Sequence, residues 1–165
     1  MKVIDDFLPS YEFEKLQSFL MGEDFDWYYN DGVVFEGDGL YQFIHIFYRW
    51  EPSPTGLLWT PTSSFGCIEP YLSSFNMKKI YRIKANLNPR SVSNLKAGYH
   101  IDNVPCSTTA ILYMNTCNGW TEFKKGDKVK SVANRVVIFD STLEHSGVSC
   151  TNENRRVVIN FNYDV

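Results

Sequence analysis

The second half of the chain consists of short apolar or alternating segments separated by turn residues, and this pattern restricts the fold more than any other feature. Seven such segments follow Lys78 at close spacing. They are residues 79–88, 97–103, 107–115, 119–132, 134–140, 146–150 and 155–165. The stretch KKGDK is typical of a hairpin turn. Seven closely spaced short strands predict a β-sandwich or a barrel.

The start of the chain predicts helical as well as extended structure. Residues 10–22 have the spacing of an amphipathic helix that Ser10 can cap, with Phe13, Leu16 and Leu20 as its buried stripe. The aromatic, alternating stretch GLYQFIHIFYRW predicts a strand. We therefore expect helix and strand before the run of short β-segments.

A region rich in proline separates these two parts. Residues 51–66 contain three prolines and two glycines, which predicts a long loop, and this loop is a candidate substrate lid. The next stretch, EPYLSSF, predicts a short helix with Pro70 in its first turn. We expect a single domain over residues 1–165, in which residues 1–77 form a helix and strand cap region and residues 78–165 form the β core.

The composition excludes several classes of protein. Hydrophobic residues make up 44% and charged residues 21%, as in an ordinary globular protein, while a net charge of −3 argues against general nucleic-acid binding. No apolar run is long enough for a membrane helix, and the acidic N-terminus MKVIDDFLPS does not have the pattern of a signal peptide. We therefore expect a cytoplasmic protein whose four cysteines, lacking any C-x-x-C pair, are reduced thiols.

His100 and Asp102 are the first candidate site residues. They stand two positions apart in GYHIDN, within a predicted strand, so their side chains should lie on the same face. An imidazole nitrogen beside a carboxylate oxygen can bind a metal. It can equally be a hydrogen-bonded structural pair, and the two residues alone do not decide between these interpretations.

His145 and Arg156 extend the candidate site. His145 follows the predicted strand NRVVIF. Alternation in the last strand sets Arg156, with Val158, Asn160 and Asn162, against the more apolar face that carries Arg155. Two histidines and a carboxylate form the facial triad of non-haem Fe(II) oxygenases, which leaves three metal positions free. An arginine on the polar inner face of a small barrel would bind an anion.

In the order of these motifs the sequence resembles the 2-oxoglutarate/Fe(II)-dependent oxygenases, especially the prolyl-hydroxylase-like branch and small uncharacterised oxygenases of tailed phages. The likeness rests on H-I-D at 100–102, LYMN ending at Asn115, GWTEF at 119–123, VVIF at 136–139 and then His145, with Arg156 eleven positions later. It covers roughly residues 98–162. Trp120 departs from the pattern, because the branch usually has a second glycine there.

The resemblance implies a fold, a chemistry and a set of residue roles. The fold would be mainly β, a double-stranded β-helix of the jelly-roll or cupin type with N-terminal buttressing helices. His100, Asp102 and His145 would bind Fe(II), and Arg156 with Tyr113 would hold the distal carboxylate of 2-oxoglutarate. Together with O₂, the enzyme would hydroxylate a substrate and release succinate and CO₂. Asp102 favours hydroxylation, because related halogenases lack that carboxylate.

Other residues receive weaker assignments. Asn86 or Arg82 would contact co-substrate or substrate if the polar face of 79–88 lines the cavity, although that face is equally consistent with solvent exposure. Tyr99 and Asn160 are second-shell candidates. His45, among aromatic residues, is expected to be a packed histidine.

Several alternatives stay open on the sequence alone. Zinc accepts the same ligands but does not require an arginine. The main alternative to an oxygenase is a non-enzymatic, metal-binding cupin-like module, followed by a hydrolase or isomerase with another metal. The substrate, a small molecule or a peptide, is not specified, and neither is the oligomeric state.

Overall fold

The protein is built mainly from antiparallel strands. The computed structural model describes residues 1–54, 56–102 and 104–165. The elements in chain order are β1 (Lys2–Ile4), α1 (Ser10–Met21), β2 (Tyr28–Asp31), β3 (Tyr41–Ser53), β4 (Gly56–Pro61), η1 (Phe65–Cys67), η2 (Glu69–Phe75), β5 (Lys79–Pro89), β6 (Thr108–Tyr113), β7 (Trp120–Phe123), β8 (Lys128–Lys130), β9 (Val136–Asp140), β10 (His145–Val148) and β11 (Arg155–Asp164). The elements η1 and η2 are 3₁₀-helices.

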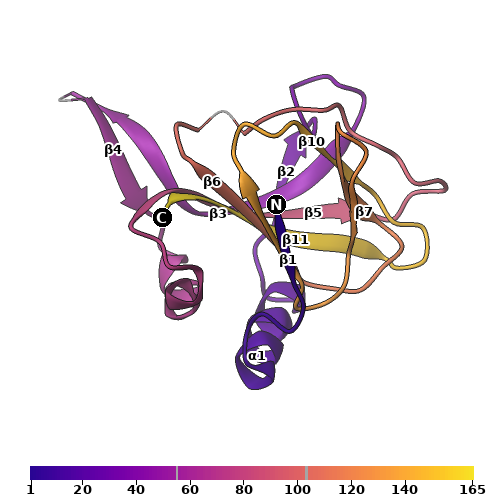
Figure 1. Cartoon of the computed structure of the whole chain (residues 1–165), viewed down its shortest axis with the longest axis horizontal. Coiled ribbons are helices and arrows are strands. Elements are labelled where there is room, and N and C mark those ends of the chain that lie inside the picture. Colours follow the sequence, from indigo (N-terminus) through magenta and orange to yellow (C-terminus); the bar gives the residue numbers. More distant parts are fainter. Residues whose placement is uncertain (55, 103) are drawn as a thin grey trace.

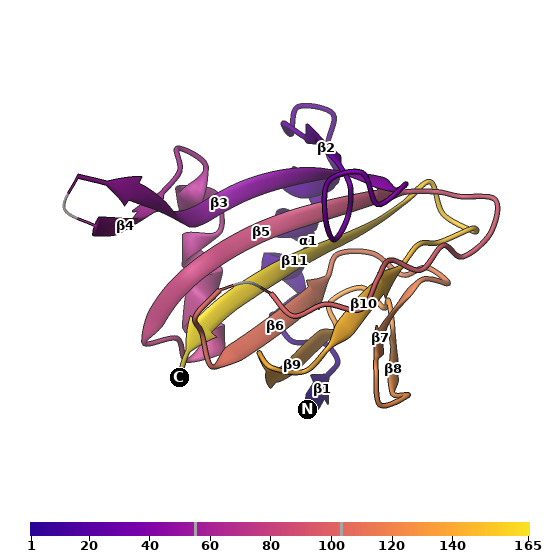
Figure 2. The same ribbon diagram turned by 90° about the horizontal axis from the view of Figure 1, so that it is seen from above.

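The strands form two sheets. The large sheet has the order β1-β9-β6-β11-β5-β3-β2, and β4 pairs with the outer part of β3. The small sheet has the order β10-β7-β8. Figure 1 shows β7 and β10 on one side of the large sheet, and Figure 2 shows the long strands β3, β5 and β11 running side by side. This layout confirms the expected mainly β, jelly-roll type of fold.

The two faces of the large sheet have different cores. On one face, α1 and η2 pack against the sheet through an apolar cluster that includes Phe13, Leu16 and Leu20, the stripe predicted from sequence. On the other face, a smaller cluster that includes Tyr113, Phe123, Val129 and Val158 fills the space toward the small sheet. A cavity lined by polar residues lies beside this second cluster and includes Val158 and Ile111 in its wall.

The residues before β5 do more than cap the core. Strands β1, β2, β3 and β4 all belong to the large sheet, with β1 on β9 and β3 on β5. Of the helices described before β5, α1 and the two 3₁₀-helices lie outside it. Long-range pairing thus joins strands of the expected cap region, residues 1–77, to strands from the second half of the chain.

The expected long loop over residues 51–66 is also wrong for much of its length. Strand β3 continues to Ser53, and β4 returns antiparallel to it, forming a hairpin. Prolines are tolerated there because β4 pairs only with β3 and is an edge strand. The side chains of residues 50–53 and 56–59 lie outside the described part, so the lid assigned to this segment stays a prediction.

Smaller details of the sequence reading also change. Helix α1 has Pro9 as its N-cap and no side-chain cap hydrogen bond, so Ser10 is the first helical residue rather than the cap. The short helix expected at EPYLSSF is present as the 3₁₀-helix η2, with its proline in the first turn. All four cysteines are free thiols. Among the described residues, no helix combines the length and the apolar content of a membrane-spanning segment.

Candidate metal centre and anion pocket

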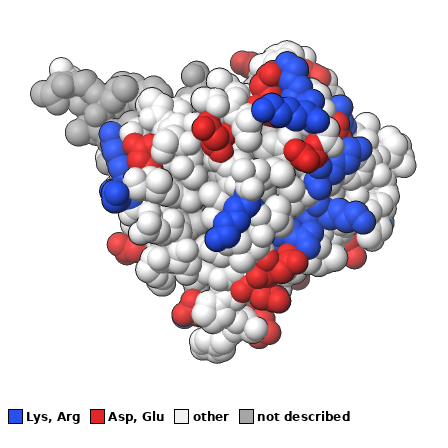
Figure 3. Space-filling view, viewed as in Figure 1, with Lys and Arg blue, Asp and Glu red and all other residues white. Residues whose placement is uncertain are grey.

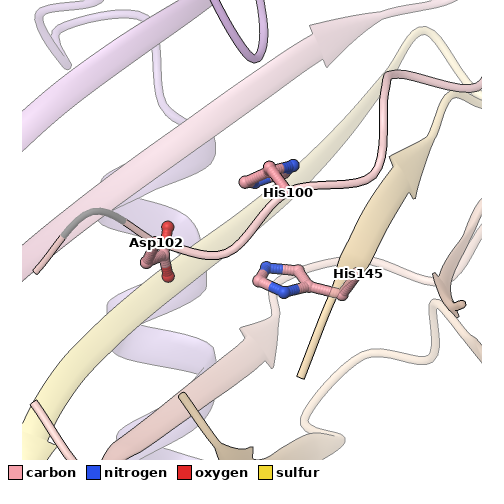
Figure 4. A group of neighbouring side chains, drawn as sticks. All are labelled: His100, Asp102 and His145. Atoms are coloured by element: carbon pink, nitrogen blue, oxygen red, sulfur yellow. The ribbon is translucent and has the colours of Figure 1, made fainter. Parts of the chain in front are cut away.

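His100, Asp102 and His145 meet in the cavity between the two sheets. Each offers one ligand atom, and these atoms all lie within 4.8 Å of one another. His145 comes from β10, whereas His100 and Asp102 come from the segment that crosses above β11 (Figure 4). All three line one cavity, and His145 and Asp102 are buried. The grouping predicted from sequence is thus present.

The segment that carries His100 is not the regular strand that the sequence predicts. It pairs with β10 only at Lys96↔Val148 and His100↔His145. Lys96 and His100 are four residues apart, whereas their partners Val148 and His145 are three residues apart. The His100 segment therefore has one extra residue, which interrupts the ladder. The chain still remains extended enough for His100 and Asp102 to face the same cavity.

Backbone carbonyls fix the tautomer of both histidines. Nδ1 of His100 lies 3.1 Å from the carbonyl oxygen of Gly98, and Nδ1 of His145 lies 3.1 Å from that of Leu143. A carbonyl oxygen can only accept, so both Nδ1 atoms carry the proton. Both Nε2 atoms are therefore free to bind a metal, as in the usual carbonyl-oriented histidine ligand.

Arg82 and Asn162 hold the carboxylate of Asp102 from both sides. Arg82 Nη2 donates to Oδ1 at 2.5 Å, and Asn162 Nδ2 donates to Oδ2 at 2.9 Å. Arg82 Nε also donates to Asn162 Oδ1 at 3.0 Å, which joins the two supports. Arg82 is therefore occupied by Asp102 rather than by a co-substrate, and the supporting role of Asn162 was missed from sequence. Only the placement of Asn162 on the Arg156 face pointed toward it.

The charge states of the site suit a divalent metal. Burial favours the neutral form of Asp102, but Arg82, Asn162, His145 and Lys84 outweigh it and lower the pKa of Asp102 to about 2. Burial lowers the pKa of His145, despite the opposing effect of Asp102. A carboxylate and two imidazole nitrogens grouped in this way fit Fe(II), which such a set binds with other positions left free.

Arg156 lies deep in the same cavity. Only 2% of its surface is exposed, and it lines the cavity together with the three candidate metal ligands. Its Nε donates to Ser131 Oγ at 2.8 Å and its Nη2 to Thr121 Oγ1 at 3.1 Å. Within the described part of the chain it has no ion pair with an acid. Burial lowers its pKa, so a bound anion would offset a real desolvation cost.

Two glycines make room for this arginine. A Cβ on Gly119 would stand 2.7 Å from Arg156 Cδ and 2.7 Å from the carbonyl oxygen of Val148, distances that real contacts do not reach. Gly147 lines the cavity beside the guanidinium, with its Cβ position 3.7 Å from Nη1. Trp120, the departure from the family pattern, points its Nε1 to Glu122 Oε2 at 3.0 Å. Gly119 is thus the glycine that the arginine requires.

The opposite face of β11 carries Arg155, as the alternation predicts. Its Nη2 donates to the carbonyl oxygen of Met21 at 2.5 Å, at the end of α1. It therefore ties the helix to the sheet and does not enter the cavity wall. This confirms the strand register on which the choice of Arg156 depends.

Tyr113 lies beside Arg156 but does not line the cavity. The guanidinium carbon of Arg156 stands 5.5 Å from the centre of the Tyr113 ring. The hydroxyl of Tyr113 donates to Thr121 Oγ1 at 2.8 Å. Thr121 therefore receives hydrogen bonds from both residues and is itself in the cavity wall. Its role was missed, although it is the threonine of the GWTEF motif.

Residues of the neighbouring strands β5 and β11 lie side by side on the cavity floor. The paired positions are Asn88–Arg156, Asn86–Val158, Lys84–Asn160 and Arg82–Asn162. Asn86 lines the cavity, so the alternative of a solvated face is wrong for this residue of β5, and Asn160 of β11 lines the cavity as well. Burial lowers the pKa of Lys84 to about 8, and Arg82 acts in the same direction while Asp102 opposes it.

Two remaining sequence assignments have clear positions. Tyr99 donates to Glu122 Oε1 at 2.6 Å and is not part of the cavity wall, so its predicted second-shell role has no hydrogen bond to support it among the described residues. His45 packs against Phe25 and Phe47, with ring centres 4.5 and 4.7 Å away. Its Nδ1 donates to the carbonyl oxygen of Asp26, which confirms a packed histidine.

Comparison with known proteins places the fold. No family model matches the sequence, and no curated protein matches it. Solved structures do match. An oxidoreductase of the 2OG-Fe(II) oxygenase family from Burkholderia pseudomallei aligns with a TM-score of 0.71 and 10% identity, over 98% of this chain and 83% of that one.

Two prolyl hydroxylases are also similar. The prolyl-4-hydroxylase of Pseudomonas putida aligns with a TM-score of 0.68 and 15% identity, over 99% of this chain and 92% of that one. A prolyl hydroxylase from Trichoplax adhaerens, solved with a hypoxia inducible factor peptide fragment, gives 0.63 and 17%, over 99% and 83%. The chain therefore has the double-stranded β-helix fold in which 2OG-Fe(II) oxygenases are built.

Proposed function

We propose that this protein is an Fe(II)- and 2-oxoglutarate-dependent dioxygenase that hydroxylates its substrate and releases succinate and CO₂. One observation carries the proposal. A set of two histidines and an aspartate shares a cavity with a buried arginine that has no acidic partner among the described residues. A metal site kept only for structure has no use for that arginine.

The residues divide the work between metal and co-substrate. His100, Asp102 and His145 would hold Fe(II). Arg156 would bind the distal carboxylate of 2-oxoglutarate, with the hydroxyls of Thr121 and Ser131 fixing the guanidinium. Iron and 2-oxoglutarate, when bound, supply the oxidising chemistry with O₂, while the protein supplies position and a largely buried cavity.

The same cavity indicates which further residues would contact the co-substrate. Asn86 lies on β5 between the Arg156 and Asp102 ends and would contact the middle of the co-substrate. Tyr113 would act on the distal carboxylate through Thr121. The prolyl hydroxylases among the similar structures make a peptidyl proline one candidate substrate, and a small molecule is the other.

The face of the molecule drawn in Figure 3 does not favour a nucleic-acid substrate. In the face shown in Figure 3, Lys and Arg gather toward the side where β7 lies in Figure 1, but Asp and Glu are interspersed among them. Glu122, for example, pairs with both Lys96 and Lys128. A mixed surface of this kind lacks the continuous positive field that phosphate backbones require.

The test is an anaerobic titration of the protein with Fe(II) and 2-oxoglutarate, followed by admission of O₂. We expect a weak visible charge-transfer band from the chelate and then succinate. Binding of metal without the band and without succinate would favour the metal-binding cupin-like module instead. Succinate formation that persists without added iron, in metal-free protein, would contradict the assignment altogether.

A further inference from the structure

The cavity floor carries one pair of polar residues that neither the metal nor the co-substrate uses. Lys84 on β5 and Asn160 on β11 are paired positions, and both line the cavity. Across residues 1–54, 56–102 and 104–165, the side-chain ammonium of Lys84 has no hydrogen bond or ion pair. Asn160 Oδ1 is fully buried and also has no hydrogen-bond partner. A half-buried cation and a buried acceptor, whose side chains have no partner among the described residues, are costly unless a ligand pairs them.

The position of this pair separates it from the co-substrate anchor. Along β5, Lys84 stands four residues from Asn88, the position opposite Arg156. That is about 13 Å of strand. Lys84 is only two residues, or about 7 Å, from Arg82, which holds Asp102. A group bound at Lys84 would therefore lie close to the metal ligands, where a substrate C–H bond must be presented.

The cavity has more positive than negative side chains, so an additional anionic group is expected there. A divalent metal and a dianionic co-substrate cancel each other. What remains is Lys84, Arg156 and the adjoining Arg82 against the single carboxylate of Asp102. Buried charges are normally paired, and no further acid lines this cavity within the described residues. We therefore expect the substrate to bring a carboxylate group as the local partner of the Lys84 ammonium.

We propose, resting on the dioxygenase function above, that the oxidised substrate is a small acid with an N–H or O–H next to its carboxylate, as in an α-amino or α-hydroxy acid. Its carboxylate pairs with Lys84, and its neighbouring donor binds Asn160 Oδ1. The ammonium supplies a charge-assisted hydrogen bond, and the amide oxygen supplies the acceptor that a carboxylate cannot use. An internal peptide residue, which has no free carboxylate, does not match this pair.

The test is calorimetric titration of protein loaded with Mn(II) and N-oxalylglycine, an inert replacement for 2-oxoglutarate. The probes are free amino acids and 2-hydroxy acids, each beside its own primary amide. We expect at least one acid to bind, with its amide at least tenfold weaker. Lys84→Met and Lys84→Gln should each weaken the acid at least tenfold and remove the preference over the amide. Lys84→Arg should restore part of it.

Two variants sharpen the result. Lys79→Met removes an exposed lysine from the same strand and should leave acid binding unchanged. Asn160→Ala should weaken an amino acid more than the matching acid that lacks the amino group. Because both variants are compared at full loading with N-oxalylglycine, changes in co-substrate affinity do not enter the comparison.

Three outcomes overturn the inference. They are amides that bind as well as acids, no acid binding to the loaded wild type, and a Lys84→Met protein that loses N-oxalylglycine affinity while keeping acid binding. The last would reassign Lys84 to the co-substrate. A wild type that never takes up Mn(II) with N-oxalylglycine would instead remove the proposed function, and this inference with it.

Discussion

The two faces of β11 show how one strand serves stability on one side and chemistry on the other. Val157, Ile159 and Phe161 are fully buried in the apolar cluster under α1 and η2. On the opposite face of the strand, Asn162 donates a hydrogen bond to Asp102, and Arg156 lines the cavity where an anion would bind. Strand β5 repeats the division, with Ile83 and Ala85 in the core and Arg82 and Lys84 toward the cavity.

The two faces differ in the free energy of burying their side chains. The cavity face carries the buried Arg156 and the half-buried Lys84, and Asp102 is buried against it; each of these charges is expensive to take out of water. The core face consists of apolar side chains whose burial stabilises the fold. Substitutions on the cavity face should therefore change binding far more than folding, and substitutions on the core face should do the reverse.

The largest effect is expected at the metal ligands. Replacing His100, Asp102 or His145 with Ala should abolish stoichiometric Fe(II) binding, because each would supply one of the three proposed protein ligands, while the protein stays folded. Metal analysis after anaerobic gel filtration measures this, with circular dichroism for the fold. His45→Phe is the matched control, since His45 is buried but lies in an aromatic cluster. Full-affinity Fe(II) binding by the His145→Ala protein would remove the triad.

The core face should show the opposite behaviour. Phe161→Ala deletes a buried ring packed 4.3 Å from Phe75, centre to centre, and should lower the free energy of unfolding by about 3–5 kcal/mol. Urea denaturation followed by circular dichroism measures the loss. Fe(II) affinity per folded molecule should stay unchanged. A variant of normal stability with weakened metal binding would show that the two faces are not independent.

The two adjacent arginines separate anion binding from helix docking. Arg156→Ala should weaken 2-oxoglutarate binding by about 3 kcal/mol, or roughly a hundredfold, because two charge-assisted hydrogen bonds are lost. Fe(II) affinity should barely change. Arg156→Lys should recover only part, since an ammonium lacks the planar fork.

Arg155→Ala is the matched control for this pair. It removes the contact with Met21 and should affect stability rather than 2-oxoglutarate. Titration of both proteins with 2-oxoglutarate under anaerobic conditions compares them directly. A dispensable Arg156 beside a critical Arg155 would reverse the assignment of the two faces.

Support of Asp102 by Arg82 should show a smaller effect. Arg82→Met should reduce Fe(II) affinity by about 10–100-fold, as for other residues that orient a metal ligand. It also changes the pH dependence of the apo-protein. Ionised Asp102, whose pKa is lowered to about 2, contributes stability above its ordinary value of 3.8 and loses it as the pH falls toward 2.

Without Arg82, burial of Asp102 should dominate and raise its pKa. Acid unfolding of the apo-protein should then begin at a higher pH in Arg82→Met than in the wild type. Thermal unfolding measured across a series of acidic buffers tests this. Identical acid profiles for both proteins would show that Arg82 does not stabilise the ionised form of Asp102.

The smallest effect is expected at Tyr113. Tyr113→Phe removes one hydrogen bond to Thr121 but keeps the ring beside Arg156, so 2-oxoglutarate binding should weaken by only about 1 kcal/mol. Tyr163→Phe, a buried tyrosine in the core cluster, serves as the comparison and should leave binding unchanged. A loss for Tyr113→Phe as large as that for Arg156→Ala would mean that the hydroxyl contacts the co-substrate itself.

Local patterns in the sequence predicted on which face of a strand several residues lie, and the resemblance of the motif order to the oxygenases indicated the residue types of the site. Alternation is a local property of an extended chain, so it placed Arg156 and Arg155 on opposite faces before any contact was known. The stripe of Phe13, Leu16 and Leu20 followed in the same way from helical spacing. The spacing of the H-x-D motif, His145 and Arg156 carried the expected metal and anion site.

Only the tertiary structure decided the pairing between distant segments. Asn162 reaches Asp102 across 60 positions of sequence, β1 joins β9, and an extra residue between Lys96 and His100 interrupts the expected strand. The register between segments depends on which buried surfaces fit together, and no local period contains that information. For the same reason, Lys84 and Asn160 became a pair only when β5 and β11 lay side by side.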